Sequence, residues 1–163
     1  MPSPPRPTAG LPQLSSWFRL STVQTTLADV LRVVGERWTL LVVREIALGL
    51  RRFDEIHAAT GAPRAVLSDR LKRLVDAGVI TPQPYQVRRS RPRLEYALSD
   101  AGLDLLPVLS ALSDWGERHL SAGATPEVSY CHQGCGSRVT ARLVCACGHQ
   151  VEPGRDLVAS VNR

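Results

Sequence analysis

The sequence predicts a mainly helical fold with one small β-hairpin, in the α+β class. Apolar residues recur with a helical period over residues 23–77, in segments separated by glycines. The period changes to two between about residues 79 and 98, which indicates a pair of strands. The chain has 163 residues, 44% hydrophobic and 21% charged, so it is long enough for one principal core and too short for two catalytic domains.

The first segment, residues 1–22, predicts a flexible arm. Prolines crowd its first twelve positions and it has no sustained period. The chain also has no apolar run near the ~20 residues that a membrane span needs, and no basic stretch leading into an apolar one. We therefore expect a chain that stays in the cytoplasm and has no contact with a membrane.

Three helices are predicted next. Apolar residues at i, i+3, i+4 and i+7 predict a helix over 23–34: Leu27, Val30, Leu31 and Val34. Residues 38–48 are apolar on most sides, as expected for a helix buried at the centre of a small bundle. Residues 52–59 predict a short third helix, which Gly61 closes.

A fourth helix and a hairpin follow. Pro63 suits a first helical turn, and an apolar stripe then continues to Gly78: Leu67, Leu71, Leu74 and Val75. Residues 79–87 predict a strand, and its two prolines confine it to a sheet edge. Residues 93–98 alternate and predict its partner, with an arginine-rich tip between them.

The last long helix is predicted over about 100–120, with Ser99 as its N-cap and Pro107 expected to bend it. This order of elements predicts a winged helix-turn-helix in a helical frame, spanning residues 23–122. Residues 123–163 form a Cys/His-rich, ribbon-like extension.

Positive charge is concentrated in the fourth helix and the hairpin. Residues 64–93 hold eight basic and two acidic side chains, a net charge of +6 against +5 for the whole chain. Such a run can be a solvated surface, and a winged helix can bind protein. Residues 85–93 contain no acidic side chain, however, which favours a polyanion such as double-stranded DNA.

The fourth helix and the hairpin tip supply the candidate DNA contacts. Burial of the apolar stripe places Ala65, Ser68 and Lys72 on the exposed side of the helix. A helix that lies in the major groove contacts base edges with side chains of this kind. Arg64 lies at the start of the same helix. The tip residues Arg88, Arg89 and Arg91 are expected to follow phosphates or enter a narrow minor groove, because guanidinium groups are always charged.

The chain resembles the HxlR-type branch of the MarR-like winged-helix transcriptional regulators over about residues 23–120. The resemblance is carried by motifs in register: Gly35-Glu36-Arg37-Trp38-Thr39, Arg51-Arg52-Phe53, Val66-Leu67-Ser68, Ala77-Gly78-Val79, Tyr96-Ala97-Leu98 and Ala101-Gly102. It implies a homodimer, built through the first and last helices. It also implies a palindromic operator, bound by two recognition helices one DNA turn apart.

The same resemblance bears on regulation. Many redox-sensing members carry a cysteine about ten residues before the glycine of the Gly35 turn, and here that position is Thr25. Thiol sensing of that type is therefore not expected. A small-molecule effector is an alternative input, with Trp38, Trp115 and Phe53 as candidate lining residues, although aromatic side chains at helical spacing are often plain core.

All four cysteines lie in the extension, and they suggest a structural zinc site. Two knuckle-like turns would supply a tetrahedral set, with Cys131 and His149 as substitutes: His132, Cys135, Cys145 and Cys147. A strand is expected between the turns, over 139–144. Some relatives carry a similar ribbon with a Cys-x-x-Cys pair, whereas this chain has Cys-x-Cys. The alternatives are a hairpin without metal that keeps reduced thiols, or one with a disulfide formed on oxidation.

An enzyme is not expected. His57 and His119 have carboxylates nearby in sequence, but neither has a nucleophile, oxyanion donors or a glycine-rich phosphate loop beside it. A metal- or thiol-responsive sensor or adaptor that uses the cysteine cluster is the alternative to a DNA-binding regulator.

Overall fold

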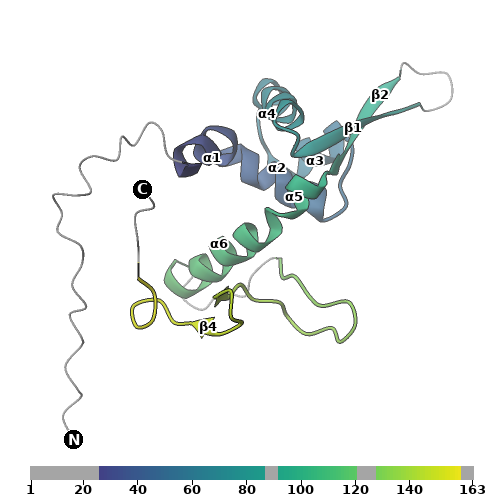
Figure 1. The fold of residues 1–163 in the computed structure, drawn as a ribbon. Helices are drawn as coiled ribbons and strands as arrows, with labels where there is room; N and C mark the ends of the chain where they lie inside the picture. The colour runs from purple at the N-terminus through teal and green to yellow at the C-terminus, as the bar shows by residue number, and fades with distance from the viewer. Residues whose placement is uncertain (1–25, 87–91, 121–127, 159–163) are drawn as a thin grey trace, which may run out of the picture.

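The computed structural model describes residues 26–86, 92–120 and 128–158, and its elements from α1 to β2 lie in the predicted order (Figure 1). They are α1 (Thr26–Val34), α2 (Arg37–Ala47), α3 (Phe53–Thr60), α4 (Arg64–Asp76), β1 (Ile80–Tyr85), β2 (Arg93–Leu98), α5 (Asp100–Leu103), α6 (Leu106–His119), β3 (Leu143–Val144) and β4 (Gln150–Val151). The mainly helical fold with a small β-hairpin is confirmed. No helix in the described part of the chain combines the length and apolar character of a membrane span.

The core lies where α2, α3 and α4 meet the base of the hairpin. Its largest fully buried apolar side chains come from these elements: Val42, Val43, Ile56, Leu67, Leu71, Leu74 and Ile80. The leucines of α4 are spaced three or four residues apart, so they share one face of the helix and turn the opposite face to solvent. The three leucines of the predicted stripe are buried as expected, and Val75 is half-buried.

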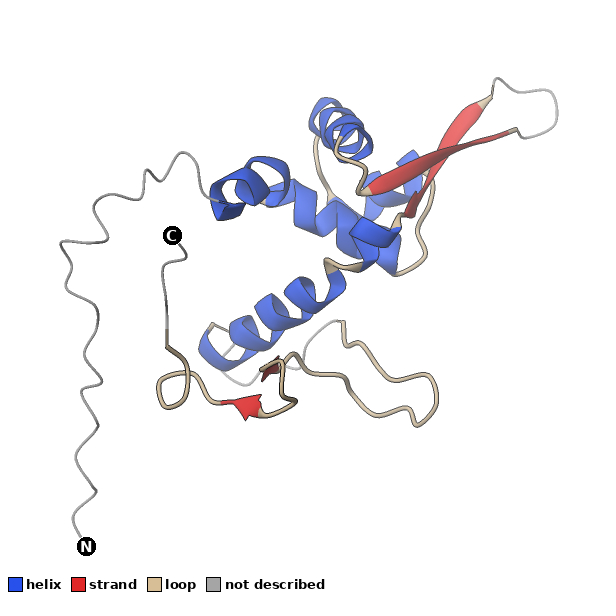
Figure 2. Ribbon diagram, viewed as in Figure 1, coloured by secondary structure: helices blue, strands red, loops and turns tan. Residues whose placement is uncertain are grey.

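Strands β1 and β2 form the wing. They pair antiparallel from Ile80 opposite Leu98 to Tyr85 opposite Arg93. At its base, β2 also contacts the segment before α3, because the Tyr96 N–H donates to the Arg51 carbonyl over 2.8 Å. The hairpin therefore projects from the helical body while its base is tied to the start of α3 (Figure 2). The tip arginines Arg88, Arg89 and Arg91 lie outside the described residues.

The prediction of a single bent helix over residues 100–120 is wrong. The chain forms two helices, the one-turn α5 and the longer α6, and Pro107 lies in the first turn of α6. A proline is tolerated there because its missing N–H has no partner within the helix in any case. Ser99 does cap α5 as expected: its Oγ accepts the Gly102 N–H over 3.2 Å.

Gly102 is a point where the fold leaves no room for a side chain. A Cβ at this position would clash with the main-chain carbonyl oxygen of Val79, which cannot move away as a side chain could. We expect Gly102→Ala to lower the free energy of unfolding by about 1–3 kcal/mol, measured by urea or thermal denaturation. Gly116→Ala is the matched control, because nothing lies within 4 Å of its Cβ position in α6. The free energy of unfolding of that variant should rise by about 0.5–1 kcal/mol. An equal fall in this free energy for both variants would refute the explanation.

Residues 128–158 of the C-terminal extension lie along α6 (Figure 1). One guanidinium nitrogen of Arg138 lies 2.5 Å from a Glu117 oxygen and 3.2 Å from Asp114 Oδ1. The other oxygen of Asp114 accepts the Ala141 N–H over 3.2 Å. The strand expected over 139–144 is shorter than predicted, since only Leu143–Val144 is extended and pairs with β4.

Candidate nucleic-acid interface

Helix α4 presents the predicted residues to solvent. Ala65, Ser68 and Lys72 are exposed on the side of the helix away from the buried leucines. Asp76 lies further along and is also exposed. An exposed helical face of small and basic side chains can enter the major groove, where it meets base edges.

The turn between α3 and α4 fixes the angle at which this face is presented. Gly61 ends α3 in the left-handed region, with φ of 67°, and its N–H donates to the His57 carbonyl over 2.9 Å. Glycine adopts this conformation without strain because it has no Cβ. The next residue, Ala62, is fully buried, and Pro63 accepts the Leu67 N–H as α4 begins. The two helices thus form a helix-turn-helix.

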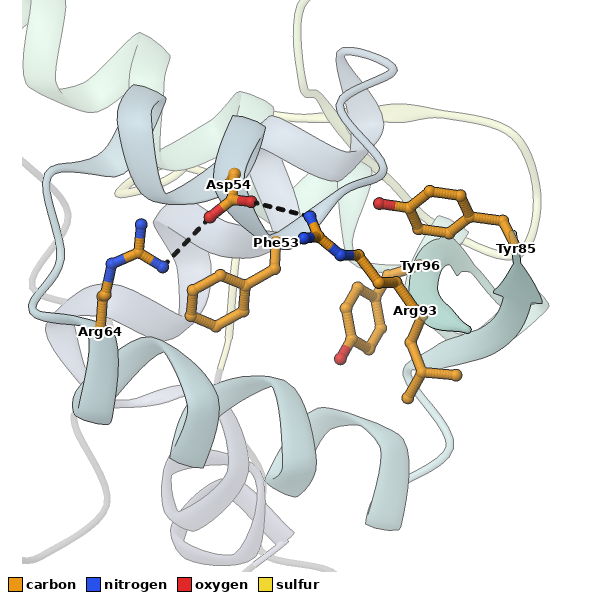
Figure 3. A pocket seen from close by; sticks show the side chains of 7 residues that line it. Phe53, Asp54, Arg64, Tyr85, Arg93 and Tyr96 are labelled. Atoms are coloured by element: carbon orange, nitrogen blue, oxygen red, sulfur yellow. Dashed lines mark hydrogen bonds and ion pairs between the residues drawn. The ribbon is translucent and has the colours of Figure 1, made fainter. Parts of the chain in front are cut away.

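Asp54 links the start of α4 to the wing. Its Oδ1 lies 3.1 Å from a guanidinium nitrogen of Arg64, and its Oδ2 lies 3.6 Å from a guanidinium nitrogen of Arg93. Figure 3 shows the two guanidinium groups on opposite sides of the one carboxylate. Arg64 is the first residue of α4 and Arg93 the first of β2, so one acidic side chain on α3 holds a cation from each.

The neighbouring carboxylate has a different role. Glu55 Oε2 accepts the main-chain N–H groups of Arg52, over 2.9 Å, and Arg51, over 3.2 Å. The hydrogen bond from Arg52 is the main reason that the pKa of Glu55 lies below its usual value. Glu55 therefore caps the start of α3, while Asp54 faces the cations.

These side chains line an open hollow of about 430 Å³ between α3, α4 and the wing: Phe53, Asp54, Arg64, Tyr85, Arg93, Leu94 and Tyr96. Arg64 lies over the Phe53 ring at 5.6 Å, and Arg52 lies over the Tyr85 ring at 4.8 Å. Burial raises the pKa of Tyr96 above its ordinary value. Arginines held on aromatic faces beside an open hollow are suited to a phosphate oxygen.

Other charges of α4 are engaged within the protein. Asp69 lies 3.0 Å from Arg73 and 3.4 Å from Arg70. Arg70 is mostly buried and also lies 3.8 Å from Glu36, before α2. Arg70 and Arg73 are therefore paired with acidic side chains of the protein, while Lys72 is exposed on the same helix.

The aromatic side chains predicted to line an effector pocket lie in three different places. Phe53 lines the hollow beside α4. Trp38 packs against the core, and Arg37 lies 4.7 Å above its ring. Trp115 is half exposed on α6, with its ring 5.3 Å from that of His119.

Three of the four predicted zinc ligands lie in two close Cys–His pairs. His132 Nδ1 lies 3.3 Å from Cys135 Sγ, and His149 Nδ1 lies 3.7 Å from Cys145 Sγ. Hydrogen bonding, first from the Ser137 side chain, lowers the pKa of Cys135. Among residues 26–86, 92–120 and 128–158, no three His, Cys, Asp or Glu side chains form a group that could hold a metal ion. The partner of Cys145 in this pair is His149, a substitute ligand in the sequence analysis.

Sequence reasoning missed the two charged residues that Arg64 meets or faces in the hollow, Asp54 and Arg93. Arg93 was counted only in the basic run, and Asp54 only as a carboxylate near His57. The position of Asp54, directly after Arg51-Arg52-Phe53 at the start of a helix, was the available signal. Its pairing with side chains 10 and 39 residues away depends on how α3, α4 and the wing meet.

Comparisons with known proteins agree with this geometry. The profile of the HxlR-like helix-turn-helix family matches residues 33–124. The HTH-type transcriptional regulator Rv3095 of Mycobacterium tuberculosis is 41% identical over 128 residues, covering 77% of this chain and 79% of that protein. Two solved structures of candidate transcription factors are also similar. PA1607 is 29% identical with a TM-score of 0.71, covering 85% of this chain and 96% of that one. PA1374 from Pseudomonas aeruginosa is 32% identical with a TM-score of 0.58, covering 84% and 92%.

Proposed function

This chain belongs to the HxlR-like helix-turn-helix family and is a transcriptional regulator of the helix-turn-helix type, and from that premise we propose that it binds a palindromic DNA operator as a homodimer. In this proposal α4 is the recognition helix. Ala65, Ser68 and Lys72 contact base edges, and Arg64 contacts DNA at the start of the helix. From the wing, Arg88, Arg89 and Arg91 contact the phosphate backbone. A DNA-bound regulator acts where the chromosome is, so the cytoplasm remains its expected location.

One observation carries this proposal. The start of α4 lies close to Arg93, at the tip end of strand β2, because Asp54 contacts both Arg64 and Arg93. A helix and a hairpin that both present basic side chains to one side match the two contacts that a winged helix makes with a duplex.

The proposed homodimer forms through helices α1 and α6. Helices α1 and α6 carry large apolar side chains that are about half exposed or more in the single chain: Leu27, Leu31, Leu112 and Trp115. Exposed apolar stripes on two helices are typical of a surface that is covered by a second protein chain. A second copy would place two α4 helices on one DNA duplex.

Footprinting tests the proposal. The full chain should protect a palindromic site in the DNA upstream of its own gene or a neighbouring gene. The affinity should fall steeply with salt because phosphate contacts release counterions. The same experiment with candidate metabolites tests the small-molecule effector. Failure to bind any duplex at low ionic strength would refute the proposed function.

Substitutions in α4 should change sequence preference. Ser68→Ala or Lys72→Ala removes a group proposed to contact bases, so the operator should lose about 1–3 kcal/mol of its advantage over unrelated DNA. Competition titrations by fluorescence anisotropy measure this difference. Arg155→Ala is the control for lost charge, because Arg155 is exposed in the extension. An equal change in Lys72→Ala and Arg155→Ala would argue against base contact.

For the extension we propose a structural zinc ion bound by His132, Cys135, Cys145 and Cys147, with Cys131 or His149 as a substitute ligand. Each close Cys–His pair supplies the nitrogen and sulfur donors that zinc prefers, and zinc binding would have to draw the two pairs together, since no three such side chains of the described residues form one group. Protein purified without chelator should contain about one zinc per chain. A stoichiometry near zero with four titratable thiols would contradict the site, and a thiol-responsive extension would then be the better candidate.

A further inference from the structure

The carboxylate of Asp54 holds two cations at the proposed DNA surface, and all three side chains are open to solvent. The side chains of Asp54, Arg64 and Arg93 are 59%, 65% and 62% exposed. Water and salt screen an exposed ion pair, so it contributes little to stability. The carboxylate can therefore be exchanged for another anion at little cost to the fold.

The two guanidinium groups already surround one anion position. Arg64 comes from α4 and Arg93 from β2, and both face the carboxylate from opposite sides (Figure 3). Arginine binds phosphate oxygens with the same donors that it uses for carboxylates. A phosphodiester between the recognition helix and the wing would meet both arginines, but only where it displaces Asp54.

We infer that Arg64 and Arg93 bind one backbone phosphate of the DNA, and that Asp54 competes with this phosphate for them. The inference rests on the proposed function, because it concerns the same DNA surface. Asp54 then limits the affinity for every duplex. It leaves the preference for the operator unchanged, since a phosphate contact carries no sequence information.

Asp54→Asn tests the competition, because it keeps the shape of the side chain and removes its charge. The affinity for the operator and for an unrelated duplex should both rise about three- to tenfold, measured by fluorescence anisotropy at low salt. A purely structural role predicts the opposite direction. Asp54 lies in the first turn of α3, where a negative charge favours the helix, so losing it should weaken the fold and any activity that depends on it.

Two controls separate this effect from a general change in charge. Glu152→Gln removes a carboxylate from an exposed pair with Arg155, far from α4 in the sequence, and should leave the affinity unchanged. In a chain that already carries Arg64→Gln and Arg93→Gln, Asp54→Asn should give no gain. Thermal unfolding confirms that each variant is folded.

The outcomes separate the inference from the function that it deepens. An unchanged or weaker affinity for Asp54→Asn, an equal gain for Glu152→Gln, or a gain that persists without both arginines would overturn the competition alone. A wild-type chain that binds no duplex would overturn the competition and the proposed function together.

Discussion

Replacing Arg88, Arg89 and Arg91 together by Glu is expected to abolish operator binding while the protein stays folded and keeps its oligomeric state. In the proposed homodimer the change reverses three charges in each of two wings, so attraction to the phosphates becomes repulsion. The affinity should fall by at least about 10³-fold near physiological salt. It should fall equally for unrelated DNA, since these contacts carry no sequence information.

The control for this prediction reverses charges elsewhere. Arg142→Glu with Arg155→Glu changes two exposed residues of the extension and should leave DNA binding nearly unchanged. Circular dichroism and size-exclusion chromatography check the fold and the oligomeric state. Unchanged affinity in the triple variant would remove the wing from the DNA contact and leave α4 to supply it alone.

Leu112→Glu combined with Trp115→Glu is expected to convert the proposed homodimer into monomers. Both side chains are 50% exposed on α6, and a covering second copy would bury the two carboxylates without partners. Two linked DNA-binding subunits bind about 10²–10⁴-fold more tightly than one. The affinity of the monomeric variant for a palindromic site should therefore fall by at least about 100-fold. Sedimentation equilibrium measures the assembly, and anisotropy measures the binding.

A matched substitution shows whether the position matters. Leu157 is 57% exposed in the extension, so Leu157→Glu places the same charge on an apolar site outside α1 and α6. That variant should keep both the assembly and the affinity. A wild-type chain that sediments as a monomer, or a double variant that stays dimeric, would exclude α6 as the dimer surface.

Much of the fold could be predicted from local patterns. The leucines of α4 recur at helical spacing and are all buried, so the outward position of Ala65, Ser68 and Lys72 followed from the period alone. The break before α6 was missed because Pro107 is compatible with both a bend inside a helix and a first turn. The choice between a bent helix and two separate helices depends on the path of the chain after Ser99. Along this path Gly102 lies against the Val79 carbonyl.

The amino-acid order by itself determined the helix-turn-helix, the hairpin and the concentration of positive charge, because periodicity, turn residues and charge are properties of neighbours along the chain. Only the tertiary structure decided that Asp54 lies between Arg64 and Arg93, and that Arg138 holds the extension on α6. Ion pairs between distant residues form where packed elements bring their ends together. The apolar contacts that fix this packing are not directional, so the sequence spacing alone did not reveal which charges would meet.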